Sequence, residues 1–460
     1  MNKPLLSALG AAVVLGGGWI GASSMAGARI ESDLQTLMNK PVNETGFHLQ
    51  KLTHQKGLLS SSGSFEAQPV LKGLSDAPAF LITYQVSHLP LPGSMARVDW
   101  SVKPTGDAAE TLRGLFGSVP QLDGQGSVSY SGAVDTSINL AALSYNQNGA
   151  TFSITPSSGH LSVDGPKGNL SWATDKLSAR GDGQAAEVSK IALDIVSTDR
   201  TLGTGTTTLS IDKISTSNGS LDGFRHAAEI VRDGDRLNAH SSETLKAGVV
   251  YGQTLSDITV EFALTGLDIA SLKSMADIMN KSDGLTNLTS DEDQEFRKNL
   301  QTLLNQGLSM GFPKVSGVAA NTHFNGRFSL DLKKAAALTD PIDLTKQLAA
   351  SGEVTVKGDA LPPDMAKTAT AMGMAQATPD GLKASADYAA GVLRANGRTL
   401  DPALITPELE QGSQMVNLLL SNSLQSTMTN GLTSPDSMDN AEAEPDNAQD
   451  AEPDENAAKQ

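Results

Sequence analysis

The stretch SVSYSGAVDTSINL, residues 127–140, decides the fold class of this chain. Its apolar side chains fall on one face of an extended backbone, and its serine, aspartate and asparagine side chains fall on the other. The apolar set is Val128, Tyr130, Val134, Ile138 and Leu140. Because a pleated strand sends successive side chains to opposite faces, this alternation predicts a strand with one buried and one hydrated face.

The same two-residue period recurs from about Gly46 to Gly397 and predicts many one-sided strands. Clear examples are Phe80/Ile82/Tyr84/Val86, Val98/Trp100/Val102, Ile191/Leu193/Ile195, Ile258/Val260/Phe262/Leu264 and Phe324/Phe328/Leu330/Leu332. Hairpin turns, which need positive φ, are predicted at Asn148-Gly149, Asp164-Gly165, Asn218-Gly219 and Asp233-Gly234. We therefore predict an α+β fold that is mainly β, built on a large antiparallel sheet, extended or curled, with a shallow core.

A helical hairpin is predicted at about 268–308, inserted between strands. Asp268 has the position of a cap for its first helix. The second helix is predicted to start at Ser290, with Asp293 three residues on as its capping partner.

Further helices are predicted toward the C-terminus. Weaker helical patterns cover 339–350 and 363–377. Asp401-Pro402 and Thr406-Pro407 each resemble a cap followed by a first-turn proline, and a last helix is predicted from about 413 to 430.

The N-terminal segment 1–28 predicts export of the rest of the chain. The run from Pro4 to Ala28 contains no charged residue and is long enough to span a bilayer. Lys3 precedes the run, and a positive residue there favours a cytoplasmic N-terminus. A retained transmembrane anchor and a cleaved signal sequence, ended by small residues such as Ala26-Gly27-Ala28, both remain open. The first alternative predicts a single inner-membrane span with a periplasmic body, and the second a soluble periplasmic protein.

Composition divides the remainder into a strand-rich body at 29–400, C-terminal helices at 401–432 and an acidic tail at 433–460. The tail holds nine acidic residues and one lysine and is predicted to be disordered. The whole chain has a formal charge of −17 and contains no basic tract, which argues against a nucleic-acid partner. It contains no cysteine, which excludes disulfides and thiol catalysis.

No catalytic, cofactor-binding or metal-ligating residue is assigned from the sequence. A G-x-S-x-G match at Gly307–Gly311 follows a helix instead of a strand, so we interpret it as a helix end closed by glycine. An S-x-x-K match at Ser210–Lys213 lies within a strand pattern. The seven histidines are scattered without the spacing of metal ligands; they are His48, His54, His88, His160, His226, His240 and His323.

The segment YAAGVLRANGRTL, from Tyr388 to Leu400, resembles the closing signature of the YdgA-type bacterial envelope proteins, a domain of unknown function. That signature is a tyrosine, a glycine and a short strand that leads into Asn-Gly and a basic residue. A Gly-Leu-Asp-Ile helix start at 266–269 and the order of the parts are also similar. The resemblance covers about residues 1–400 and implies inner-membrane attachment with a periplasmic body, without any catalytic residue.

Three functions follow as hypotheses. The first is a non-enzymatic, membrane-anchored scaffold or interaction protein, partnered by itself or by another envelope protein. The second is a module that holds a lipid or another hydrophobic ligand in an apolar groove of the sheet. An enzyme that acts on envelope polymers is the third, and it requires two carboxylates that face each other in a cleft.

Overall fold

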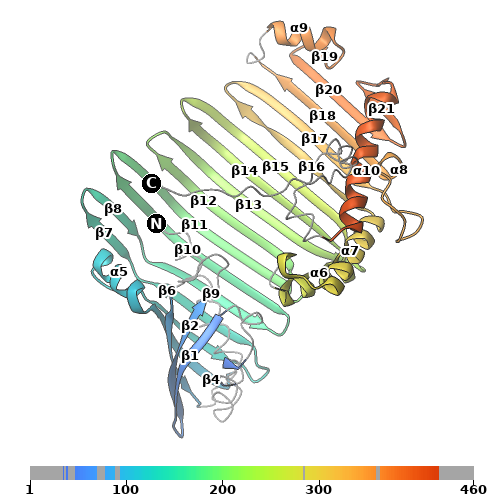
Figure 1. The fold of residues 1–460 in the computed structure, drawn as a ribbon. Coiled ribbons are helices and arrows are strands. Elements are labelled where there is room, and N and C mark those ends of the chain that lie inside the picture. The colour runs from blue at the N-terminus through green and yellow to red at the C-terminus, as the bar shows by residue number, and fades with distance from the viewer. Residues whose placement is uncertain are drawn as a thin grey trace, which may run out of the picture.

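The computed structural model describes residues 35, 38, 39, 47–69, 78–88, 94–282, 285–358 and 363–423. Within these ranges the chain forms one antiparallel sheet of 22 strands, with helices along its margins (Figure 1). The predicted mainly β fold is therefore confirmed. The segment 1–28 and the tail 433–460 lie outside the described residues. In the described part of the chain, no helix combines the length and the apolarity needed to cross a bilayer.

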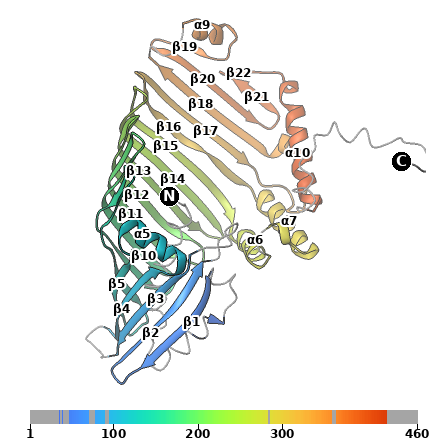
Figure 2. The ribbon, with the colours of Figure 1, turned by 60° about the vertical axis from the view of Figure 1, so that its left-hand side comes forward.

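The first strands form a curled N-terminal part, here called the N-terminal curl. In sheet order it contains β1 (Phe47–Lys56), β2 (Ser60–Pro69), β3 (Phe80–Ser87), β4 (Ala96–Pro104), β5 (Leu122–Val128), β6 (Val134–Leu140) and β9 (Ser157–Asp164). Figure 2 shows β1–β5 turning away from the long strands that follow. The hairpin of β7 (Leu143–Gln147) and β8 (Ala150–Ile154) pairs instead with the far half of β10 (Lys167–Gly181).

The long strands form a central sheet of successive hairpins. After β10 come β11 (Gln184–Asp199), β12 (Thr204–Thr216), β13 (Gly219–Asp233), β14 (Arg236–Val250), β15 (Gln253–Asp268), β16 (Leu308–Ala319), β17 (Thr322–Leu332) and β18 (Leu348–Lys357). The sheet ends with β20 (Gly381–Ala389), which β19 (Gln376–Thr378) and β21 (Val392–Ala395) flank, and with β22 (Arg398–Thr399). Three of the four predicted turn glycines, Gly149, Gly165 and Gly234, lie between successive strands with positive φ, as predicted. The fourth, Gly219, is the first residue of β13, and the turn before it is Ser217-Asn218.

The stretch 127–140 is a hairpin and not one continuous strand, which corrects the sequence prediction. Its ends belong to β5 and β6, and Gly132 between them has φ +86°. The Ser129 hydroxyl accepts a hydrogen bond from the amide of Ala133 at 2.9 Å and closes the turn. Tyr130 lies in this turn with 61% of its surface exposed, so it does not belong to the buried face.

The main core fills the inside of the N-terminal curl. Phe65, Phe80, Ile82 and Val102 come from three adjacent strands, and each is at most 2% exposed. The register between these strands places all of these side chains on the same face of the sheet. The curl closes that face on itself. The helical hairpin supplies a second, smaller cluster that packs on Leu267 and Leu308 at the ends of central strands.

A line of mostly charged residues crosses the central sheet where the backbone pairing is interrupted; we call it the bend line. It consists of Asp175, Lys190, Asp212, Gly223, Lys246 and Asp257, which lie opposite one another on β10–β15 where the backbone pairing skips one residue on each strand. The side chains of Lys190 and Asp212 form an ion pair across this line, at 3.2 Å. Lys190, Gly223 and Asp257 have positive φ, on every second strand. Two successive residues are exposed at the line in β10 and β12, so the alternation changes phase there and the apolar residues stay on one side.

The predicted helical hairpin is confirmed as α6 (Ile269–Lys281) and α7 (Ser290–Asn305). Asp268 caps α6 by accepting the Ser271 amide at 2.8 Å, as predicted. The cap of α7 is Thr289 and not Ser290, because Glu292 returns to Thr289 in a capping box. Asp293 instead pairs with Arg297 at 2.9 Å.

The weaker helical predictions are only partly correct. The pattern at 339–350 holds a single helical turn, α8 (Leu344–Gln347), and β18 then begins at Leu348 because it pairs with β17. The pattern at 363–377 holds α9 (Pro363–Ala371) before β19. The last helix, α10, runs over Thr406–Ser421, earlier than the predicted 413–430. Asp401 caps a short 3₁₀ turn, η3 (Pro402–Leu404), as predicted, but Thr406 lies inside α10 and is not its cap.

Candidate functional site

The central sheet carries one continuous apolar face, which we call the inner face. The register of neighbouring strands places side chains of this face in rows that cross from β10 to β20. The middle row is Trp172, Leu193, Leu209, His226, Glu243, Val260, Val315, Gly326, Val354 and Ala384. Apart from its two central members, this row is uncharged over ten strands.

Three further rows extend the same face on both sides of the middle row. The first is Thr174, Ile191, Ile211, Phe224, Leu245, Ile258, Gly317, Phe324, Val356 and Leu382. The second is Leu170, Ile195, Thr207, Ala228, Ser241, Phe262, Phe312, Phe328, Gly352 and Ala386. The third is Gly168, Ser197, Gly205, Ile230, Ala239, Leu264, Met310, Leu330, Ala350 and Tyr388.

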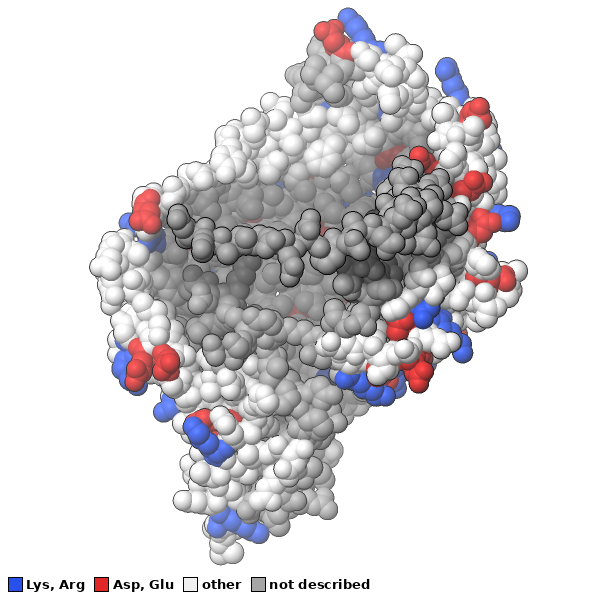
Figure 3. Space-filling model, in the orientation of Figure 1, with Lys and Arg blue, Asp and Glu red and all other residues white. Residues whose placement is uncertain are grey.

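Part of this face is open to solvent. Met310, Phe312, Phe328 and Val354 are neighbours on β16–β18 and are 38–44% exposed. Soluble proteins seldom leave adjoining large apolar side chains uncovered unless the patch binds something. Figure 3 shows the molecule hollowed in the view of Figure 1, with the charged side chains mainly along the rim of the hollow.

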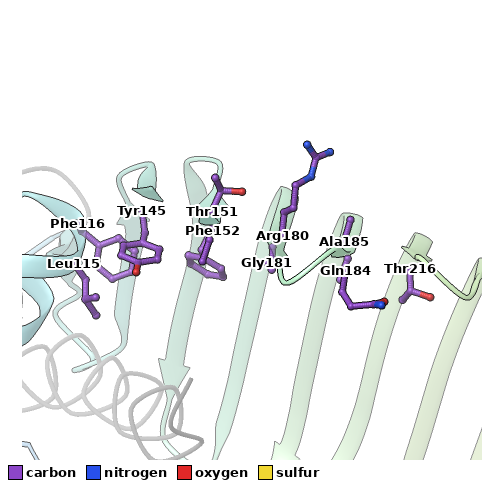
Figure 4. A pocket seen from close by; sticks show the side chains of 13 residues that line it. Leu115, Phe116, Tyr145, Thr151, Phe152, Arg180, Gly181, Gln184, Ala185 and Thr216 are labelled. Atoms are coloured by element: carbon purple, nitrogen blue, oxygen red, sulfur yellow. The ribbon is translucent and has the colours of Figure 1, made fainter. Parts of the chain in front are cut away.

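A pocket of about 680 Å³ lies at one end of the sheet, beyond the bend line and beside α5 (Gly106–Phe116). Phe116 meets Phe152 of β8 edge to face, with ring centroids 6.1 Å apart. Figure 4 shows Tyr145 and Phe152 grouped near Phe116, while Arg180 extends away from them. Helix α5 was not predicted from the sequence, although its alanine, leucine and glutamate content favours a helix.

The inner face holds a hydrogen-bonded pair, His226 with Glu243, at its centre. The two side chains are directly opposed on β13 and β14, and His226 Nδ1 lies 2.8 Å from Glu243 Oε1. Their side chains are 32% and 37% exposed. In the sequence, His226 is one of seven scattered histidines and was not predicted to belong to a site. Its position in the alternating series Phe224, His226, Ala228, Ile230 is the signal that would have placed it on the apolar face.

The other sequence motifs lie apart from this pair and serve the fold. Gly307 has φ +81° and follows the C-cap of α7, so the G-x-S-x-G match is a helix end, as predicted. Ser309, within that match, is the second residue of β16 and donates a hydrogen bond to Asp331 on β17. The S-x-x-K match lies within β12, as predicted, and its Asp212 belongs to the bend line.

The closing signature also has a structural role. Tyr388 is 4% exposed and donates its hydroxyl to the carbonyl of Thr345 at 2.9 Å. Asn396 forms the predicted turn, accepts the Ser385 amide at 2.9 Å and donates to Gly373 O at 2.7 Å. These contacts fasten the last strands of the sheet to α8 and to the end of α9.

A polar depression of about 580 Å³ lies on the opposite face of the N-terminal curl. It includes the carboxylates of Asp99 and Asp123 on neighbouring strands, and the hydroxyls of Thr83 and Ser101, which lie 2.6 Å apart. Asp99 Oδ1 is buried and has no hydrogen-bond partner among the described residues. The depression bears on the enzyme hypothesis because two carboxylates, those of Asp99 and Asp123, line it.

One comparison with known proteins gives a match. A family model described as "Bacterial protein of unknown function (DUF945)" matches residues 1–403. No curated protein and no solved structure matches the chain. The match confirms the expected membership of a bacterial family of unknown function, while the YdgA name stays a prediction.

Proposed function

The chain belongs to the DUF945 family of bacterial proteins, and we propose that this member holds the acyl chains of a lipid against its inner face. The observation that carries the proposal is the run of rows across β10–β20, which are uncharged apart from the His226–Glu243 pair. Phe312, Phe328 and Val354 in these rows are partly exposed. Covering apolar surface contributes about 25 cal/mol per Å², so a long chain laid across several strands gains substantial affinity without any polar contact.

The shape of the site favours an extended ligand over a compact one. The rows run across successive strands, and neighbouring strands in a sheet lie about 4.8 Å apart. A flexible chain that follows a row therefore meets a new apolar side chain at each strand. The open, mainly apolar pocket beside Phe116 and Phe152 offers a place for one end of such a chain.

We also propose that the protein is not an enzyme and that residues 1–28 attach it to the bacterial inner membrane, with the body in the periplasm. A lipid-holding surface works by binding alone and needs no reacting groups. A reporter enzyme fused to the C-terminus tests the topology: activity restricted to the cytoplasm contradicts it. A scaffold role, through self-association or another envelope protein, is the alternative if the inner face binds no lipid.

Lipid binding is tested directly on detergent-extracted, full-length protein by native mass spectrometry and by titration with a fluorescent acyl probe. We expect co-purified lipid and saturable probe binding. Replacing both Phe312 and Phe328 by Gln should weaken probe binding about tenfold or more, because two apolar contacts of the ligand are lost.

The matched control is Val196→Gln. Val196 is 44% exposed on β11, but its neighbours Ile195 and Ser197 lie on the inner face, so its side chain lies on the other face. This variant should bind the probe as the unmodified protein does. Absence of both co-purified lipid and probe binding, or equal losses in the two variants, overturns the proposal.

A further inference from the structure

The hydrogen-bonded pair at the centre of the inner face has an apolar setting. The partners of His226 and Glu243 in the neighbouring strands are Leu209 and Val260. Along their own strands, the nearest side chains on this face are Phe224 and Ala228, and Ser241 and Leu245. In the four rows given above, no other position holds a histidine, a lysine, an arginine, an aspartate or a glutamate.

The internal hydrogen bond fixes what the pair can offer to a ligand. An ionised carboxylate is an acceptor only, so the proton between Glu243 and His226 must belong to Nδ1. In the neutral imidazole, Nε2 then carries a lone pair and no proton. The second carboxylate oxygen of Glu243 is likewise an acceptor. With the imidazole neutral, the one N–H donor of the pair is therefore used within the pair, and only acceptors remain for a ligand.

We propose that the His226–Glu243 pair is the polar anchor of the groove and that it selects an amphiphile whose polar group donates a hydrogen bond, such as a lipid hydroxyl or an amide N–H. The inference rests on the proposed function. A purely apolar ligand that covered the pair would leave the free acceptors desolvated and unpaired, which costs affinity. A carboxylate or phosphate ligand would place its own negative charge next to the Glu243 carboxylate, and a neutral imidazole would not offset the repulsion.

A comparison with the opposite face separates this role from that of an ordinary cross-strand pair. Arg327 and Glu353 are also directly opposed, on β17 and β18, but their side chains lie on the outer face, and their shortest N–O distance is 3.4 Å. Glu353 also contacts Lys383 Nζ at 3.1 Å, and the Arg327 side chain is 71% exposed, so water can reach the remaining hydrogen-bonding positions of this pair. On the inner face, a bound lipid would displace that water, so the ligand itself must supply the missing donor.

The test compares two lipids with the same acyl chain at pH 8, by displacement of a fluorescent acyl probe from the full-length protein in detergent. Monooleoylglycerol carries hydroxyl donors, and methyl oleate carries none. We expect the hydroxyl-bearing lipid to bind about tenfold more tightly. In the His226→Leu/Glu243→Leu variant this preference should disappear, while methyl oleate binds as well as before or better.

The control variant Arg327→Leu/Glu353→Leu should keep the full preference. If the inner-face leucine variant fails to fold, Glu243→Gln replaces it, since an amide that offers its own donor should reduce the preference severalfold. Equal binding of the two lipids to the unmodified protein, or a preference that survives both inner-face variants, overturns the anchor and leaves lipid holding intact. Binding of neither lipid overturns the proposed function and the anchor together.

Discussion

The N-terminal curl and the central sheet use the same face of one continuous sheet in opposite ways. In the curl, side chains such as Ile82 and Val86 are fully buried. In the central sheet, Phe328 and Val354 stand at equivalent alternating positions and are 42% and 44% exposed. Both regions have the sequence pattern of a half-buried strand. The difference shows that closure of the sheet, and not the pattern along a strand, decides whether an apolar face becomes a core or a binding surface.

The curl closes because small residues let large ones lie across them. Trp100 donates its indole N–H to Thr136 at 2.9 Å, two strands away, and its ring passes over Gly124 on the strand between. Gly159 makes similar room for Trp172 where the curl meets the central sheet. In the central sheet, Phe262 and Phe312 meet edge to face within the inner face and leave it open.

The largest expected contrast is in stability. Phe65→Ala, at a position 2% exposed, should lower the free energy of unfolding by about 3–5 kcal/mol, since a buried cavity replaces the ring. Phe328→Ala, on the open face, should cost about 1 kcal/mol. Urea denaturation followed by circular dichroism measures both. Similar losses for the two variants would mean that the central face is as firmly packed as the curl.

Two glycines, one in the curl and one in the central sheet, allow the same comparison with a smaller expected loss of stability. A Cβ on Gly124 would lie 2.2 Å from the Trp100 ring and 2.3 Å from Ser137 O, so Gly124→Ala should cost about 1–3 kcal/mol. A Cβ on Gly352 of the central sheet would meet the Phe328 ring at 3.7 Å, an ordinary contact. Gly352→Ala should therefore change the urea midpoint little. A larger loss for Gly352→Ala would contradict the open inner face.

The bend line gives a third test, confined to the central sheet. Gly223 has φ +67°, and a Cβ there would lie 2.9 Å from Cβ of Lys246. Gly223→Ala should cost about 1–2 kcal/mol through both strain and crowding. Gly132→Ala serves as the control, since Gly132 also has positive φ but nothing lies within 4 Å of its Cβ position. Equal losses in the two variants would show that backbone strain alone acts at the bend.

Alternation and turn chemistry were enough to predict the sheet, the helical hairpin and the Asp268 cap, because each depends on a few neighbouring residues. The stretch 127–140 shows the limit: alternation continued formally through a turn that Gly132 and the Ser129 side chain create. The helical pattern at 348–350 failed for the opposite reason, since pairing with β17 outweighed local preference.

The candidate site could not be predicted because it depends on register between strands. His226 and Glu243 are separated by 17 positions in sequence and meet only through pairing of β13 with β14. The bend line also makes the site harder to predict from sequence, because the two-residue period of apolar positions shifts by one residue at charged doublets such as Asp212-Lys213. A continued two-residue count would place Leu209 and Ile214 on opposite faces, whereas the change of phase keeps them on the same one.

The smallest expected effect concerns pH and belongs to the curl. Burial, with the positive charges of His54 and Lys56, lowers the pKa of His88, which lies 2.7 Å from the buried Ser61 hydroxyl. The folded state therefore binds the proton less readily than the unfolded state, in which histidine titrates near 6.5. Stability is complete above about pH 6.5 and declines as the pH falls below that value. The urea midpoint should thus be lower at pH 5.5 than at pH 7.5, and His88→Gln should reduce this difference. The control variant His240→Gln, at an exposed position, should keep the difference between the two pH values. An unchanged pH dependence in His88→Gln would show that His88 does not control the loss of stability in acid.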